Sequence, residues 1–140
     1  MEQIIRELTS STKNRIDSQR KWVRDHYLPD SISEYNSIEG KLKLLNTILQ
    51  SDWIGKDETN KLQCLGVTLG DVIVQKCGFR WVEVEDDLGT DPALKLLDTS
   101  IILFPVTMIS KRIENGETVN IYDLFERIEN NINELINTKN

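Results

Sequence analysis

The feature that most constrains the fold is a hydrophobic period that changes twice along the chain. Apolar residues recur at helical spacing before Gly78 and after Pro105, whereas residues 79–85 alternate in polarity and are rich in aromatic and β-branched types. Such alternation predicts a strand. Helices on both sides of a short β segment predict an α+β fold. With 140 residues, 39% of them hydrophobic and 29% charged, the chain suits a single domain with one core.

About five helices are predicted, so the expected fold is mainly helical. The apolar stripes place them at residues 2–27, 37–51, 57–77 and 105–115, with a fifth helix that Asn120 caps. Gly78 occupies the position of a left-handed residue after a helix, and Pro105 the first position of the next helix.

The β part is expected to be a small antiparallel two-stranded hairpin packed on the helices. Its strands are residues 79–85 and 99–104, joined by turn-forming residues 86–92 and a short helical or extended passage at 93–97. A two-stranded hairpin is unstable alone, so helices must cover at least one face.

The predicted organisation is one domain over residues 1–140. Residues 1–28 form an N-terminal helix and residues 36–137 a compact α+β body. Segment 2–27 carries six basic and four acidic residues on a chain of net charge −6. The helix therefore either packs against the acidic body or serves as a docking arm for a partner.

Gly66 and Gly70 lie one turn apart inside the predicted helix 57–77. Each costs helix stability, about 1 kcal/mol relative to Ala. Close approach of another helix or strand is the expected compensation. A phosphate-binding loop is disfavoured, because the spacing matches neither phosphate-binding fingerprint and does not follow a strand.

Charge and hydropathy limit the partners and the compartment. With 23 Asp and Glu against 17 Lys and Arg, general binding of nucleic acid is not expected. No window is long and apolar enough to span a membrane and the start does not resemble a signal peptide, so the cytoplasm is the expected location. Cys64 and Cys77 are expected to be free thiols, since they lie 13 positions apart on one predicted helix. No cofactor is expected.

The stretch from about residue 62 to 135 resembles a family of uncharacterised bacterial proteins, domain of unknown function 3806. The resemblance rests on residues 65–71 (LGVTLGD), Trp81-Val82, residues 87–94 (DLGTDPAL), Phe104-Pro105 and residues 109–112 (ISKR). It implies a bacterial origin and supports the α+β topology. It implies no activity, cofactor or catalytic residue.

The sequence offers little catalytic chemistry. His26 is the single histidine, at the end of a predicted helix, and no nucleophile-elbow, zinc-protease or kinase pattern is present. A surface or helix-capping histidine is the alternative to a catalytic one. The chain is therefore predicted not to be an enzyme.

Carboxylates are concentrated in residues 83–98, where six acids accompany one base, Lys95. On a strand, alternate side chains share a face, so Glu83 and Glu85 are expected beside Trp81. An exposed acidic ridge with an aromatic anchor suits a basic partner. The predicted partner-binding residues are Trp81, Glu83, Glu85, Asp86, Asp87 and Asp91. No metal site is predicted, because the spacing after Asp87 does not match a calcium loop.

A basic spot is a further alternative. Lys111 and Arg112, with Arg80, could bind an anionic ligand, or they could balance the acidic hairpin and the end of their own helix.

Three functions remain open on sequence alone. The first is a non-catalytic protein-interaction module with a basic partner, for example an immunity protein that neutralises a bacterial toxin. The second is an enzyme, or a small-molecule or metal-binding protein, that uses the hairpin carboxylates. The third is a structural or oligomeric role, and the oligomeric state is open. A pocket with a perturbed carboxylate would favour the second, and an exposed acidic ridge the first.

Overall fold

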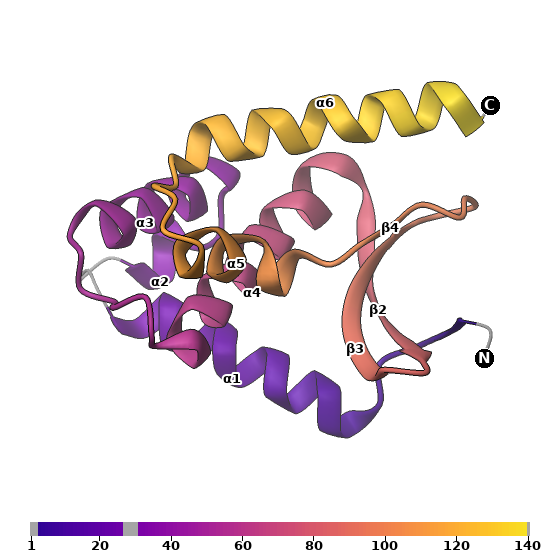
Figure 1. Cartoon of the computed structure of the whole chain (residues 1–140), viewed down its shortest axis with the longest axis horizontal. Coiled ribbons are helices and arrows are strands. Elements are labelled where there is room, and N and C mark those ends of the chain that lie inside the picture. The colour runs from indigo at the N-terminus through magenta and orange to yellow at the C-terminus, as the bar shows by residue number, and fades with distance from the viewer. Residues whose placement is uncertain (1–2, 27–30, 140) are drawn as a thin grey trace.

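The computed structural model describes residues 3–26 and 31–139 and shows an α+β fold with a four-stranded antiparallel sheet (Figure 1). Helix α4 lies at the centre, with α1 on one side and α6 on the other. The elements in chain order are β1 (Ile4–Arg6), α1 (Ser10–His26), α2 (Ser31–Glu34), α3 (Ile38–Gln50), α4 (Thr59–Cys77), β2 (Phe79–Asp86), β3 (Gly89–Leu96), β4 (Ile102–Leu103), the 3₁₀ turn η1 (Pro105–Thr107), α5 (Met108–Glu114) and α6 (Ile121–Lys139).

Local signals placed most helices correctly. The Ser37 hydroxyl accepts a hydrogen bond from the Gly40 N–H at 2.8 Å and caps α3. Gly78 ends α4 with φ of 80°, in the left-handed region. The Asn120 side chain accepts bonds from two N–H groups in the first turn of α6. Pro105 opens a 3₁₀ turn before α5, so the predicted helix 105–115 is divided.

The predicted continuous helix over residues 2–27 is wrong. Its first part is the short strand β1, and α1 begins only at Ser10. The reason is the run of hydroxyl residues, which favour helix starts over helix interiors. The Thr9 hydroxyl accepts a bond from the Thr12 N–H at 3.3 Å. The end of the predicted helix at residue 27 and the His26 side chain lie outside the described residues.

The α1 helix packs along α4 and buries Ile16 and Val23. Residues 31–36, which precede α3, contain the short helix α2 and the buried Tyr35.

The α+β class and the antiparallel sheet are confirmed, but the sheet has four strands in the order β1-β2-β3-β4 rather than the predicted two. The predicted pairing of residues 79–85 with 99–104 is wrong, because β2 pairs with β3 and with β1. The strand β3 was missed because Gly89, Asp91 and Pro92 are typical of turns. It pairs with the whole of β2, and β4 then pairs with β3. Since β4 reaches only Leu94 and Lys95, Pro92 lies beyond the part of β3 that β4 pairs, where a missing N–H is tolerated.

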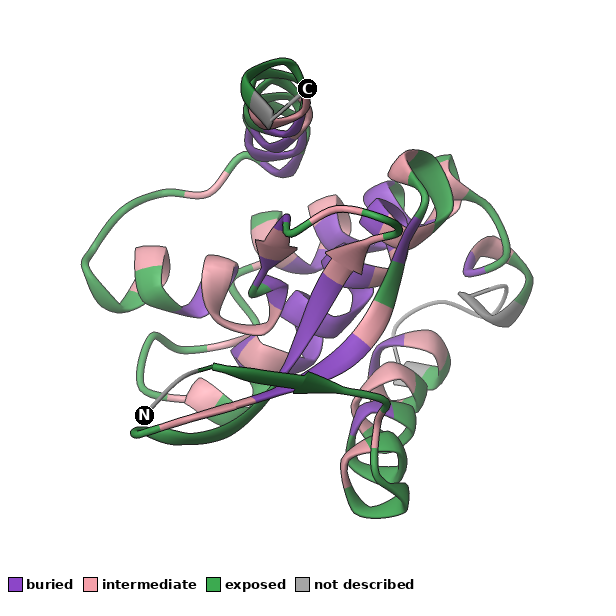
Figure 2. Ribbon diagram, turned by 90° about the vertical axis from the view of Figure 1, so that its right-hand side faces the viewer, coloured by how far each residue is buried: buried purple, intermediate pink, exposed green. Residues whose placement is uncertain are grey.

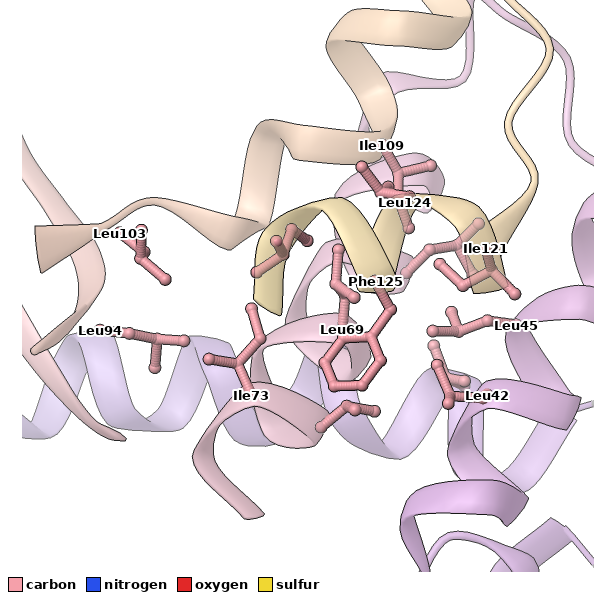
Figure 3. Close-up of a cluster of buried hydrophobic side chains, with 14 of the residues drawn as sticks. Leu42, Leu45, Leu69, Ile73, Leu94, Leu103, Ile109, Ile121, Leu124 and Phe125 are labelled. Carbon is pink, nitrogen blue, oxygen red and sulfur yellow. The ribbon is translucent and has the colours of Figure 1, made fainter. Parts of the chain in front are cut away.

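The main core lies between the helices and one face of the sheet. Figure 3 shows side chains of α3, α4 and α6 converging, with Phe125 among Leu45 and Leu69. Leu94 and Leu103 join this cluster from the strands. On the other face, Val82, Val84 and Ala93 form a smaller buried cluster. Figure 2 shows β1 exposed along its length at the edge of the sheet.

Both glycines of α4 lie in close contact with other elements, and the predicted approach of another backbone is found at one of them. A Cβ on Gly66 would lie 2.1 Å from the Val106 carbonyl oxygen, so the backbone of η1 occupies that space. A Cβ on Gly70 would lie 2.4 Å from the Trp81 ring and 3.0 Å from the Pro105 ring. The approach of another backbone is thus found at Gly66, whereas Gly70 meets side-chain rings.

Candidate functional site

The alternation predicted along β2 is correct, but the face on which Trp81 and Glu83 lie is turned inward. Trp81 packs against the main core, whereas its neighbour Val82 belongs to the cluster on the opposite face. Trp81 is half-buried, and its indole N–H donates to Asp71 at 3.0 Å. Trp81 is therefore held within the fold rather than standing on an exposed ridge.

Asp71 of α4 is the centre of a polar network that sequence reasoning missed. Arg20 of α1 binds it with two hydrogen bonds, from Nε at 2.6 Å and from Nη2 at 2.8 Å. The Tyr35 hydroxyl donates to the same carboxylate at 2.6 Å and lies 3.0 Å from the Thr68 hydroxyl. Burial, reinforced by the charge of Asp71, raises the pKa of Tyr35, and the bonds to Asp71 raise the pKa of Arg20. The network joins α1, the turn after α2, α4 and β2.

Glu83 is buried, with 1% of its surface exposed, so its assignment to an exposed ridge is wrong. Arg6 of β1 donates to it from Nε at 2.9 Å, and Thr9 donates from its N–H at 3.2 Å and its hydroxyl at 3.0 Å. Hydrogen bonds from the Thr12 hydroxyl, from Thr9 and from Arg6 lower the pKa of Glu83 to about 2. Glu83 therefore fastens β1 and the start of α1 to the sheet.

Glu83→Gln should lower the free energy of unfolding at pH 7 by about 2 kcal/mol, because a carboxylate bonded to a cation and to hydroxyl groups is replaced by a neutral amide. The pKa of the folded state is below its usual value of about 4.3. The stabilising effect of Glu83 is therefore complete above pH 4.3 and is lost as the pH falls toward about 2. Urea unfolding at several pH values measures the difference between parent and variant, which should shrink below about pH 4.3. A difference that stays constant to pH 3 would contradict the assignment.

The remaining predicted residues lie near the turn between β2 and β3. Glu85 is one-third exposed and binds Arg6 at 2.8 Å. Asp86 accepts the Leu88 N–H at 2.8 Å, which shapes the turn, and Asp87 is exposed. Leu88 is 94% exposed at the tip, and Ile4, opposite Glu85 in the sheet, is 47% exposed. We call Ile4, Glu85, Asp86, Asp87 and Leu88 the tip surface.

Asp91 is exposed and lies at a different feature, a cavity of about 460 Å³. Residues of α1, α4, β3, η1 and α5 form its walls, and Lys111 lines it together with Asp91. Of the predicted basic spot, only Lys111 reaches this cavity. Arg112 donates to the Met108 carbonyl at 2.8 Å, and Arg80 is an exposed residue of β2. The structure therefore places Lys111 and Asp91 in the wall of one cavity, which Arg80 and Arg112 do not line.

Neither a metal centre nor a membrane segment is found in the described part of the chain. No three residues among its His, Cys, Asp and Glu are placed to hold a metal ion together. Its helices are too short or too polar to cross a bilayer.

Comparison with family models gives a match to a domain of unknown function, DUF3806, over residues 41–125. This is more than half of the chain. The chain belongs to the DUF3806 family. No curated protein sequence matches it. Among solved structures, a protein from Bacteroides thetaiotaomicron superposes with a TM-score of 0.73 at 15% identity. The alignment covers 90% of this chain and 47% of that one, so this chain spans about half its length. At this identity the likeness shows the fold alone.

The residues on which the DUF3806 resemblance rests are distant in sequence but meet in the structure. Gly70 lies against the rings of Trp81 and Pro105, and Trp81 binds Asp71, the residue after Gly70. Asp91, from the third motif, lines the cavity that η1 and α5 close. The motifs therefore describe one region, made of α4, the base of the β2–β3 hairpin and the cavity beside it.

Proposed function

We propose that this DUF3806 protein is a non-catalytic interaction module that binds a basic protein through the tip surface. A bacterial toxin that the chain neutralises is the concrete form of this partner. The observation that carries the proposal is the placing of exposed apolar side chains among carboxylates. Leu88 and Ile4 lie beside Glu85, Asp86 and Asp87 at one end of the sheet.

Both components suit recognition of a basic protein. The carboxylates accelerate association through long-range attraction, and the apolar groups supply area that is removed from water on binding. The interactions of Glu83 with β1 and with the start of α1 hold the tip surface on a fixed base. A preorganised surface loses less conformational entropy on binding.

The observations favour binding over catalysis by the hairpin carboxylates. A general acid at neutral pH needs a raised pKa. Glu83, the hairpin carboxylate with a large shift, has a lowered pKa and is bonded to Arg6 and Thr9. It is therefore suited to a structural role.

The test compares the parent with the double variant Asp86→Lys/Asp87→Lys. Binding to a basic partner isolated with the parent is followed by surface plasmon resonance over a salt series. The association rate of the double variant should fall about tenfold or more, and that of the parent should fall as salt rises. Leu88→Ala should instead raise the dissociation rate.

A matched control reverses two charges elsewhere. Glu126→Lys/Glu134→Lys, at two exposed positions of α6, changes the net charge by the same amount as Asp86→Lys/Asp87→Lys. This control variant should retain most of the association rate of the parent. If the association rate falls equally in both double variants, the effect comes from total charge and the tip surface is not the binding site. Full binding by Asp86→Lys/Asp87→Lys would also exclude it.

A further inference from the structure

The cavity between α1, α4, β3, η1 and α5 is separate from the tip surface and contains many unused polar groups. Its volume of about 460 Å³ lies in the range of small-molecule sites, about 300–1,000 Å³. The groups that could donate hydrogen bonds into it belong to Arg15, Gln19, Asn60, Gln63, Thr107 and Lys111.

These six side chains lack a polar partner in the part of the chain whose side chains are described. Among the side chains that the structure describes, residues 3–25 and 33–138, no ion pair is formed by Arg15 or Lys111, and no side-chain hydrogen bond is formed by the three amides or by the Thr107 hydroxyl. The Gln19 Oε1 atom is buried without a donor. A buried acceptor without a partner destabilises the folded state. A polar cavity wall that does not stabilise the fold is typical of a binding site.

We propose that this cavity binds a small organic monocarboxylate. Arg15 of α1 and Lys111 of α5 bring two unpaired cations to it from different walls. Carboxylate oxygens are the natural acceptors for these cations and for amide N–H donors. The proposal is independent of the protein partner at the tip surface.

The other lining residues restrict the ligand further. Pro92, Phe104 and Val106 supply apolar surface, and Phe104 is 39% exposed. These side chains suit a ligand in which an apolar group is attached to the carboxylate. Asp91 is the single carboxylate among the lining residues. Its charge opposes a second negative charge, so the cavity favours a monoanion over a polyanion.

The experiment titrates the full chain with three probes by calorimetry and by NMR of the backbone amides. The first is 3-phenylpropionate, the second its neutral amide, 3-phenylpropionamide, and the third is citrate. The acid should bind with a dissociation constant of about 1 mM or tighter, as expected for a ligand of this size. The amide and citrate should each bind at least tenfold more weakly, and the acid should shift the amide signals of Gln63 and Thr107.

Variants separate a built site from general charge attraction. Arg15→Ala and Lys111→Ala should each weaken binding of the acid about tenfold, and Asp91→Asn should strengthen it. Lys13→Ala is the matched control, because it removes an exposed cation of α1 that does not line the cavity, and should leave the affinity unchanged. The proposal is overturned if 3-phenylpropionate does not bind, if its amide binds equally well, or if Lys13→Ala weakens binding as much as Arg15→Ala.

Discussion

Asp71→Ala should lower the free energy of unfolding by about 3 kcal/mol. The substitution leaves the Arg20 guanidinium, the Tyr35 hydroxyl and the Trp81 indole N–H without their common acceptor. Removing one partner of a buried ion pair typically costs about 3–5 kcal/mol. The lower end applies here, because the Arg20 side chain is 26% exposed and can be partly rehydrated.

Urea unfolding followed by tryptophan fluorescence and by circular dichroism measures this loss. Asp17→Ala is the matched control, since it removes the other carboxylate that binds Arg20, at 2.7 Å. Asp17 is half-exposed and one turn away on the same helix, so its removal should cost less than about 1 kcal/mol. Equal losses for the two variants would show that Asp71 contributes no more than a surface pair.

The helices were predictable because their signals are local. Ser37, Gly78 and Asn120 act within a turn of their own positions, and the apolar stripe of α6 is regular. A distant contact is not needed to recognise any of them. The same holds for Gly66, whose position inside a helical pattern predicted close packing although its neighbour in η1 could not be named.

The strands were predicted less well, because whether a segment forms a strand depends on the strand with which it pairs. Residues 89–92 have turn chemistry, yet they form the first half of β3 because β2 lies alongside. Strand propensity depends on such context. β1 has three residues, too few for a periodic pattern, so it was included in the predicted helix over residues 2–27. The hydroxyl residues at 9–12 were the signal that this helix begins only after β1.

In the acidic hairpin, the local pattern predicted which residues share a face of the strand but not which face is exposed. Alternation correctly grouped Trp81 with Glu83, but which face of a strand is covered depends on elements elsewhere in the chain. Glu83 is covered by β1 and the start of α1, more than 70 residues earlier. Asp71 was missed for the same reason, since Arg20 lies 51 residues away in sequence. Lys111, in contrast, was named with Arg80 and Arg112 as a cation that could bind an anion, and of these three it alone lines the cavity.

Gly66→Ala should destabilise the protein by about 2–3 kcal/mol, although alanine improves helix propensity by about 1 kcal/mol. The added methyl would lie 2.1 Å from the Val106 carbonyl oxygen, so either α4 or η1 must move. Backbone atoms cannot rotate away as a side chain can. Since η1 also lines the cavity, the displacement should weaken ligand binding there as well.

Thermal and urea unfolding measure the stability of Gly66→Ala, with Gly70→Ala as the comparison. At Gly70 the methyl meets the rings of Trp81 and Pro105 rather than backbone, and the Trp81 ring is tied to Asp71. Gly70→Ala should therefore destabilise less than Gly66→Ala and alter tryptophan fluorescence, whereas Gly66→Ala should leave that fluorescence nearly unchanged in the folded protein. Two variants with equal stability to the parent would show that α4 and η1 can separate freely. The contact at Gly66 would then be incidental, and the cavity wall built on η1 would not be rigid enough to hold a ligand in one position.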